Sequence, residues 1–156
     1  MRSDSLSRIR IVVTGATGGI GGALVPALVD RGAVVAVTGP LTDRLDSMVR
    51  DHPLVFAQAA NIIHEPEVAD FFQAAAAQLG GIDVLVNLAG LSIPGEKATF
   101  PVESCNAMID VNVLGTFLSC KHAIPHLKEQ RGLIINVGSV AGTRPNATAP
   151  GYCRAG

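Results

Sequence analysis

The chain has 156 residues, of which 48% are hydrophobic, and its formal net charge is −1 at pH 7. This length and apolar content predict one domain with one core over residues 1–156. Charges of both signs are scattered, which argues against a nucleic-acid or membrane surface and favours a small neutral or anionic molecule as the partner.

Short apolar runs alternate with helix-length segments, a pattern typical of βαβ units and a parallel sheet. The predicted strands are residues 9–14, 33–38, 54–58, 82–87 and 132–137, and the predicted helices are residues 20–30, 43–50, 65–79 and 102–128. Gly32 and Gly80 stand where helix C-caps belong. We expect a three-layer, doubly wound, Rossmann-like α/β sheet with strand order 3-2-1-4-5. Its ligand crevice should open at the carboxyl ends of strands one and four.

Residues 14–21 read Thr-Gly-Ala-Thr-Gly-Gly-Ile-Gly, between the first predicted strand and the first predicted helix. A strand that enters a glycine turn and leaves as a helix directs free N–H groups and the positive end of a helix dipole at one point, where a pyrophosphate fits. The pattern alone also fits an ordinary tight turn. Similar clusters at residues 87–90 and 138–139 end two other predicted strands, which favours ligand binding.

Residues 1–8 lack the apolar core of a signal peptide, and no apolar run approaches a membrane span, so we expect a cytoplasmic protein. Cys105, Cys120 and Cys153 show no C-x-x-C spacing and are expected to be reduced thiols. His122 and His126 share a helix face at a spacing that metal sites use. No third ligand is near them in the sequence, so we predict no metal site.

These motifs together resemble the short-chain dehydrogenase/reductase family of the common single-domain type. Residues 14–21 match its T-G-x-x-x-G-x-G cofactor loop, and residues 87–90 match its N-N-A-G with Leu88 in place of the second Asn. Asn112 occupies the active-site Asn position on the long predicted helix. Ser139 occupies the active-site Ser position, and Tyr152 follows thirteen residues later, the family's usual separation. The match runs through the whole chain.

The resemblance implies an NAD(P)-dependent oxidoreductase that transfers a hydride between a nicotinamide and a carbonyl or alcohol substrate. Tyr152 would exchange a proton with the substrate oxygen, Ser139 would hydrogen-bond that oxygen, and Asn112 would support a water relay. Asn61 stands where the family commonly has an Asp that contacts adenine. The implied cofactor-binding residues are Thr14, Gly15, Thr17, Gly18, Gly19, Ile20, Gly21, Gly39, Asn61, Ile62, Asn87, Ala89 and Gly90. A homo-oligomer through the long helix 102–128 is also implied.

One position departs from the family pattern. The family has a Lys four residues after the Tyr, which binds the nicotinamide ribose and lowers the phenol pKa, and here that position is Gly156. An unassisted phenol titrates near pH ~10, so about one molecule in a thousand would be phenolate at neutral pH. We therefore expect impaired catalysis from this chain. We also expect a C-terminally truncated sheet that leaves residues 133–137 as an uncovered apolar edge.

The choice of cofactor depends on the end of the second predicted strand. Gly39 and Pro40 supply neither the acid of NAD-preferring members nor the base of NADP-preferring ones, and the absence of a repelling carboxylate leans toward NADP. Arg44 is the nearest cation, although it also fits a solvated helix residue. Two other classes stay open. One is a non-catalytic dinucleotide-binding module or inactive fragment. The other is a sugar-nucleotide epimerase-like relative, which the short chain and the Asn112 position disfavour.

Overall fold

The structure is a computed structural model, and it describes residues 5–40, 43–52, 54–96 and 98–144. The strands are β1 (Arg10–Thr14), β2 (Val34–Thr38), β3 (Val55–Ala57), β4 (Val84–Asn87) and β5 (Leu133–Asn136). The helices are α1 (Gly19–Asp30), α2 (Asp43–Asp51), α3 (Glu65–Leu79), α4 (Val102–Ile109) and α5 (Gly115–Gln130), with a π-helical turn η1 (Asp110–Leu114) and a 3-10 turn η2 (Val140–Gly142). None of the described helices is both long and apolar enough to cross a membrane.

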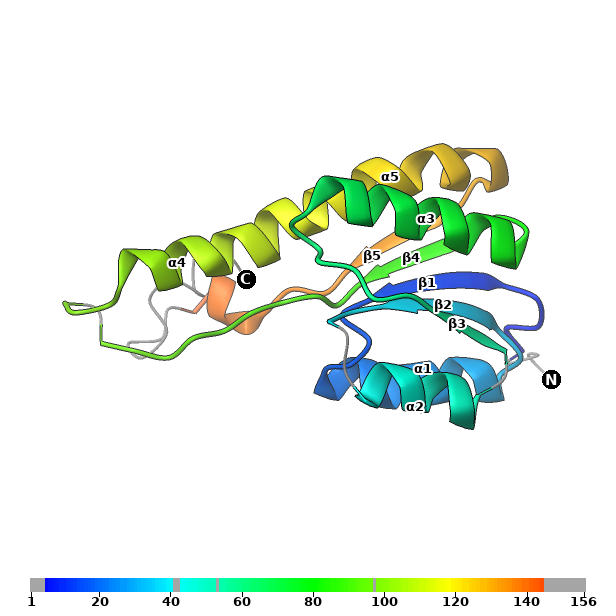
Figure 1. The fold of residues 1–156 in the computed structure, drawn as a ribbon, viewed down its shortest axis with the longest axis horizontal. Coiled ribbons are helices and arrows are strands. Elements are labelled where there is room, and N and C mark those ends of the chain that lie inside the picture. The colour runs from blue at the N-terminus through cyan, green and yellow to red at the C-terminus, as the bar shows by residue number, and fades with distance from the viewer. Residues whose placement is uncertain (1–4, 41–42, 53, 97, 145–156) are drawn as a thin grey trace.

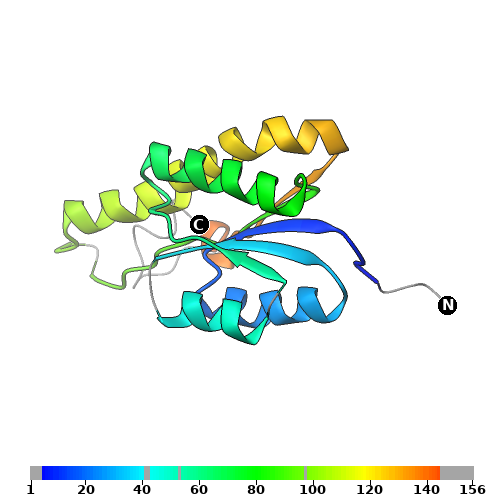
Figure 2. The same cartoon turned by 45° about the vertical axis from the view of Figure 1, so that its right-hand side comes forward.

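The strands form one parallel sheet in the order β3-β2-β1-β4-β5, which confirms the predicted topology. Helices α1 and α2 cover one face and α3 and α5 cover the other (Figure 1), and the same three layers are seen after a 45° turn (Figure 2). Strand β1 pairs with β2 on one side and with β4 on the other. The turns that leave these three strands therefore meet at one edge of the sheet.

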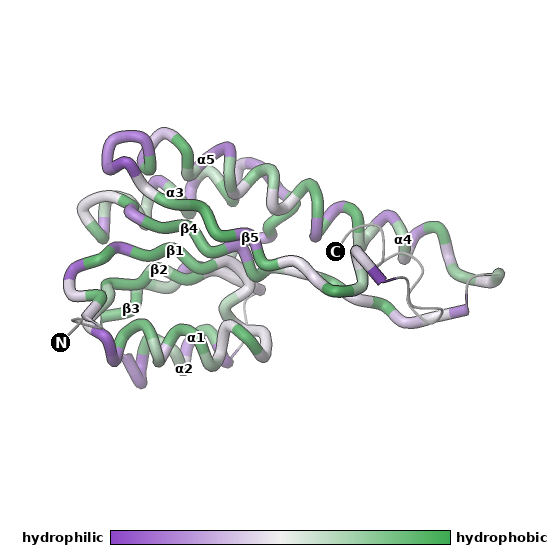
Figure 3. Tube along the Cα trace, turned by 180° about the vertical axis from the view of Figure 1, so that it is seen from behind, coloured by the Kyte–Doolittle hydropathy of each residue, from purple (hydrophilic) through white to green (hydrophobic). Residues whose placement is uncertain are grey.

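The core has two halves, one on each face of the sheet. Val12 and Leu85 belong to the cluster under α3 and α5, whereas Val13 and Val35 belong to the cluster that includes residues of α1 and α2. Successive strand residues point to opposite faces, and because both faces are covered, the strands are hydrophobic along most of their length (Figure 3). This explains why the strands appear in the sequence as nearly continuous apolar runs.

The predicted helix over residues 102–128 is present as one helical run to Gln130, but it is not α-helical throughout. Helix α4 ends at Ile109, the π-helical turn η1 follows, and α5 then continues to Gln130. The side chain of Asn112, in the middle of η1, binds the backbone of Leu91: its Oδ1 accepts from the Leu91 N–H at 2.7 Å and its Nδ2 donates to the Leu91 carbonyl at 3.1 Å. This contact comes from a distant segment, so the helical period does not reveal it.

The edge strand β5 is shorter than predicted and is exposed. Leu133 and Ile135 are 56% and 42% accessible to solvent, and β5 pairs only with β4. The predicted apolar edge is thus confirmed for the described part of the chain. The other four strands are likewise shorter than predicted, because pairing with a neighbour, and not apolar character alone, sets where a strand ends.

At the opposite end of the sheet from the crevice, an ion pair joins β1 to the start of β4. The Arg10 Nη2 donates to Asp83 Oδ1 at 2.7 Å, and the Arg10 Nε and backbone N–H both donate to Asp83 Oδ2 at 2.9 Å. The guanidinium also donates to the Gly80 carbonyl. The hydrogen bonds from the Arg10 side chain, and then the one from its backbone, lower the pKa of Asp83.

We expect Asp83→Asn to lower the free energy of unfolding by about 1–2 kcal/mol at pH 7, because it removes the charge from a half-buried, multiply bonded pair. A depressed carboxyl pKa stabilises the fold above the unfolded-state value, near ~3.9, and that contribution is lost as the pH falls through the folded-state pKa. Denaturant unfolding at a series of pH values should therefore show the variant and the parent converging below about pH 4. A difference that stayed constant down to pH 2 would contradict this account.

Candidate active site

The glycine turn after β1 lies against the turn after β4. Gly15 has a φ of +67°, and a Cβ at this position would be 2.5 Å from the Ala89 amide nitrogen. A Cβ on Gly21 would lie 2.5 Å from the Ala16 carbonyl oxygen. Both positions therefore require glycine, one for contact between the two turns and the other for close packing of α1 on the turn.

The first turn of α1 presents unpaired amides. Gly18 caps the helix without a side chain, and Gly22 is the residue whose N–H donates back to the Gly18 carbonyl, at 2.8 Å. Within the described residues, the N–H groups of Gly19, Ile20 and Gly21 have no acceptor. A Cβ on Gly19 would have no atom within 4 Å, so there is open space in front of these amides. Free amides at the positive end of a helix dipole form an anion site.

One side of this turn opens into a cavity of about 590 Å³. Its lining includes Gly15, Thr17, Gly18, Thr38, Gly39, Pro40, Ala59, Ala60, Asn61, Ile62, Glu67, Leu88, Ala89, Gly90, Leu91 and Val111. Glu67 is the only charged residue among them. Its carboxylate accepts from the Asn61 N–H at 2.7 Å and contacts His64 Nδ1 at 2.9 Å, and these contacts lower the pKa of Glu67. The other described residues of the cavity wall are uncharged, which is typical of a small-molecule site.

The other side of the turn opens into a second cavity, of about 480 Å³. Its lining includes Gly15, Gly18, Gly19, Ile20, Gly21, Leu88, Ala89, Gly90, Ser92, Asn112, Thr116, Asn136, Val137 and Gly138. The two cavities share Gly15, Gly18 and the turn at residues 88–90. The two cavities together are called the cleft, which follows the carboxyl edge of the sheet, and the residues with the free amides of α1 line its second cavity.

The structure brings most of the predicted site residues to this cleft. Those that line it are Gly15, Thr17, Gly18, Gly19, Ile20, Gly21, Gly39, Asn61, Ile62, Ala89, Gly90 and Asn112. Thr14 and Asn87 are buried beneath it, where Thr14 Oγ1 lies 3.4 Å from Asn87 Oδ1 and accepts from the Ala89 N–H. These two residues support the turn from below.

The remaining predicted residues lie elsewhere. Ser139 follows Gly138 of the cleft wall, and its Oγ accepts from the Ala141 N–H at 3.1 Å as the cap of η2. Tyr152 and Gly156 lie outside the described residues. Arg44 is exposed, and its Nη2 is 3.3 Å from where a Cβ of Gly22 would be, over α1 and away from the cavity lining.

Sequence reasoning missed five polar or charged residues of the cleft: Thr38, Glu67, Ser92, Thr116 and Asn136. Thr116 follows Asn112 by one helical turn, and its Oγ1 donates to the Asn112 carbonyl at 2.8 Å. The Oδ1 of Asn136 accepts from Asn87 Nδ2 at 2.8 Å. Thr38 and Asn136 are the last residues of β2 and β5, and a polar residue at or near the end of a predicted strand was the available signal for these two.

Residues 10–155 match the short chain dehydrogenase family. The chain belongs to the short-chain dehydrogenase/reductase family. An uncharacterized oxidoreductase of Staphylococcus epidermidis is 34% identical over 143 residues, which cover 90% of this chain and 62% of that protein. One from Staphylococcus saprophyticus is 34% identical over 137 residues, which cover 84% of this chain and 58% of that protein.

Solved structures of the same family share the fold. The crystal structure of gox2181 superposes with a TM-score of 0.91 at 25% identity, covering 98% of this chain and 63% of the other. A mutant of a Serratia marcescens short-chain dehydrogenase/reductase superposes with a TM-score of 0.88 at 28% identity, covering 96% and 63%. The chain spans about three-fifths of the length of these relatives. The short-chain dehydrogenase/reductase family consists of oxidoreductases that bind NAD or NADP and act on small molecules.

Two glycine substitutions separate the roles of the turn. Gly15→Ala should lower the free energy of unfolding by more than about 2 kcal/mol, because its Cβ meets the Ala89 backbone and its φ is positive. Gly19→Ala should leave the stability within about 0.5 kcal/mol, because its Cβ would meet open space. Thermal and denaturant unfolding of the ligand-free proteins measure both. Equal effects of the two substitutions would show that the two turns are not in contact.

Proposed function

We propose that this short-chain dehydrogenase/reductase binds NAD(P) in the cleft and transfers a hydride between the nicotinamide and a carbonyl or alcohol. The supporting observation is the continuity of the cleft, which runs from the uncharged cavity beside Asn61, past the free amides of α1, to Asn112 and Gly138. A dinucleotide has three parts in the corresponding order: adenosine, pyrophosphate and nicotinamide riboside. The bound cofactor supplies the hydride donor or acceptor, and the protein supplies position and proton transfer.

The described residues fit such a cofactor. The amides of Gly19, Ile20 and Gly21 are placed to bind a pyrophosphate, and no acidic side chain stands in the first turn of α1. The Ile62 N–H has no acceptor among the described residues and borders the first cavity, so it can bind an adenine nitrogen. The Asn61 Oδ1, which already accepts from the Ile63 N–H at 3.3 Å, keeps a lone pair for the adenine amine.

For the choice between cofactors we propose a small preference for NADP. Neither Gly39 nor Pro40 brings a carboxylate against a 2′-phosphate, and Glu67, the charged residue of that cavity, is held by the Asn61 N–H and by His64. The preference should be small because none of the described lining residues carries a positive charge.

The proposed catalytic residues are Tyr152, Ser139 and Asn112. Tyr152 exchanges the proton with the substrate oxygen, and Ser139 hydrogen-bonds that oxygen. The carboxamide of Asn112 is committed to the Leu91 backbone, so Asn112 supports a relay by holding the η1 turn and the cleft wall in place. The substrate belongs at the end of the cleft near Asn112, between η1 and the end of β5.

A non-catalytic dinucleotide-binding module is the second candidate function. The position at which the family has its ribose-binding Lys is Gly156. The glycine cradle is complete, whereas the group that lowers the phenol pKa in the family is replaced. Binding of the dinucleotide without turnover is the outcome that would favour this candidate.

We also propose that two copies pair through the outer face of η1 and α5. Val113 and Phe117 are 51% and 60% exposed, and one helical turn separates them. Ile124, two turns further along α5, is also exposed. An exposed apolar stripe of this kind is typical of a helix that packs against a partner.

Calorimetric titration of the full 156-residue chain with NADPH and NADH tests the cofactor proposal. We expect saturable binding of both, with NADPH favoured by less than about tenfold. Gly19→Ala should weaken both by about tenfold or more, because its methyl group would occupy the space in front of the amides. Gly22→Ala is the matched control, because Gly22 lies in the same helix and its N–H already donates to Gly18. Folded protein that binds neither dinucleotide would refute both candidate functions.

Turnover distinguishes the two candidates. Reduction of any member of a panel of aldehydes and ketones by NADPH would establish the oxidoreductase, whereas saturable binding without turnover across the panel would favour the module. In an active protein, Ser139→Ala should lower kcat by about 10²-fold or more while leaving the Kd for NADPH unchanged, because the hydroxyl is proposed to act on the substrate oxygen.

Phe117→Glu should convert a dimer into a monomer, because it places a charge in the centre of the proposed apolar interface. Sedimentation equilibrium of the parent and the variant measures this. Lys128→Glu, an exposed charge change near the end of α5, is the control and should leave the mass unchanged. A monomeric parent protein at concentrations of about 100 µM would exclude this pairing.

A further inference from the structure

The last residues of four strands form one row across the sheet. Thr38 of β2 is in register with Thr14 of β1, which is in register with Asn87 of β4, which is in register with Asn136 of β5. Residues in register on parallel strands point to the same face. This face is the one under α3 and α5, because Val12, two residues before Thr14, packs in that half of the core.

Three members of the row are joined by hydrogen bonds. The Thr14 Oγ1 donates to the Asn87 Oδ1 at 3.4 Å, and the Asn87 Nδ2 donates to the Asn136 Oδ1 at 2.8 Å. Asn87 Nδ2 also lies 3.5 Å from the Cys120 Sγ of α5. These side chains therefore satisfy one another beneath the cleft.

Thr38 is the exception. Its side chain is 1% exposed, and its Oγ1 is the one buried side-chain polar atom of the described residues that has no hydrogen-bond partner. Its backbone carbonyl is occupied, since it accepts from the Ala16 N–H at 3.2 Å. A hydroxyl that is buried without a partner destabilises a protein, so its presence here calls for a ligand.

The surroundings of Thr38 identify the kind of ligand. Thr38 lines the first cavity together with Gly39, Ala60 and Asn61, at the end where we place adenosine. A Cβ on Gly39 would lie 3.0 Å from the Thr17 Oγ1, so the Thr17 hydroxyl lies beside Gly39 as well. A threonine hydroxyl can bond to either group of an adenosine, because sugar hydroxyls donate and accept, the adenine amine donates, and the adenine ring nitrogens accept.

We propose that the Thr38 hydroxyl is a binding group for the adenosine part of the dinucleotide, and that ligand binding satisfies this hydroxyl, which lacks a partner in the free protein. The inference rests on the proposed cofactor function. It assigns the hydroxyl the same role with NAD as with NADP, because adenosine is common to both. The inference also predicts that removing the hydroxyl raises the stability of the free protein and lowers ligand affinity.

Thr38→Val tests the proposal, because valine keeps the shape and removes the hydroxyl. The melting temperature of the ligand-free protein should rise by about 2–4 °C, since an unsatisfied buried group is removed. The affinities for ADP and NADH, measured by calorimetry on the full chain, should fall by about three- to tenfold. Thr38→Ser, which retains the hydroxyl, should bind both ligands within about twofold of the parent.

Ser119→Ala is the matched control for a buried hydroxyl. Ser119 is fully buried in α5, and its Oγ donates to the Gly115 carbonyl at 2.8 Å. Its replacement should lower the melting temperature and leave ligand affinity unchanged. A purely structural hydroxyl behaves in this way. The melting temperature should therefore rise in Thr38→Val and fall in Ser119→Ala, and ligand affinity should fall only in Thr38→Val.

Two results would overturn the inference. Unchanged affinity in Thr38→Val would show that the hydroxyl does not contact the ligand, and a lowered melting temperature would show that it already has a partner, such as an internal water, in the free protein. If the parent chain bound neither ADP nor NADH, the proposed function itself would fail. Parent binding with an unaltered Thr38→Val affinity refutes only the role of Thr38.

Discussion

The close approach of Gly15 to Ala89 is the constraint on which the site depends. Strands β1 and β4 are neighbours at the centre of the sheet, and their connections leave toward opposite faces, so the two turns must pass each other at contact distance. A side chain at Gly15 would separate them. Because the backbones touch, the cleft has a cavity on each side of the contact, and the residues with the free amides of α1 line the second of them. The fold thus creates a site of three parts from one steric requirement.

The polar row beneath the cleft shows how the same edge is made compatible with a hydrophobic core. Deeper in the sheet every position between the helices is apolar, whereas the last register position holds Thr14, Thr38, Asn87 and Asn136. Burial of such groups is tolerated where they bond to one another, and three of the four do. Thr38 is the exception, and it is a residue of the wall of the first cavity. Under the proposed role of Thr38, its hydroxyl lowers the stability of the free protein and contributes to ligand binding, whereas the side chains of Thr14, Asn87 and Asn136 are satisfied by one another.

Much of the fold was predictable from the sequence because it depends on local patterns. The alternation of apolar runs and helical segments predicted the layers and the strand order, and the glycines of residues 14–21 predicted the cradle. The π-helical turn at Asn112 was not predictable, because Asn112 is bound to the Leu91 backbone twenty-one positions away. The role of Thr38 was hidden for a similar reason: a threonine at a strand end looks ordinary until the register aligns it with Thr14.

The π-helical turn explains how α4 is connected to the cleft. Figure 1 shows α4 and the segment that precedes it extending beyond the carboxyl edge of the sheet. Two contacts join these segments: Asn112 binds both backbone groups of Leu91, and the Ile93 N–H lies 3.3 Å from the Met108 Sδ. A carboxamide that donates and accepts at one peptide fixes its orientation as well as its distance.

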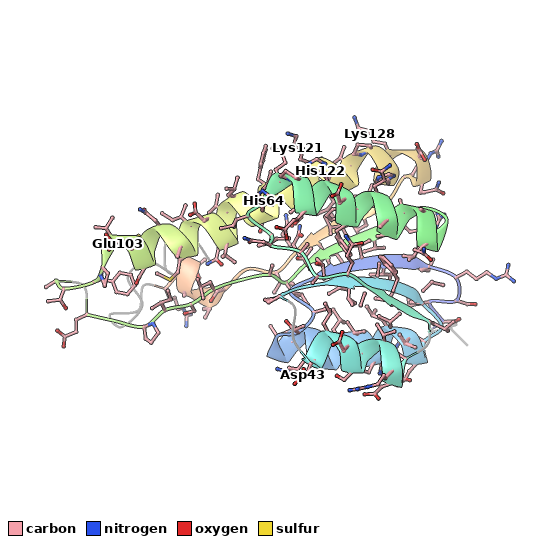
Figure 4. All side chains as sticks on the ribbon, in the orientation of Figure 1. Asp43, His64, Glu103, Lys121, His122 and Lys128 are labelled. Carbon is pink, nitrogen blue, oxygen red and sulfur yellow. The ribbon has the colours of Figure 1, made fainter. Side chains whose placement is uncertain are left out.

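The charged contacts of α3 and α5 lie on the outside of the same layer. His64, Lys121 and His122 gather near the start of α3 (Figure 4), where Glu65 accepts from Lys121 at 2.6 Å and contacts His122 Nε2 at 3.2 Å. These bonds lower the pKa of Glu65 and tie α3 to α5 at the surface. Exposed pairs of this kind add little to stability, so the alignment of the two helices depends mainly on their packing in the core. The alignment matters because Ile62, just before α3, packs against Gly115 at the start of α5, where a Cβ would lie 2.9 Å from the Ile62 side chain. The Asn61 and Asn112 ends of the cleft are thus positioned relative to each other through α3 and α5, as well as through the sheet.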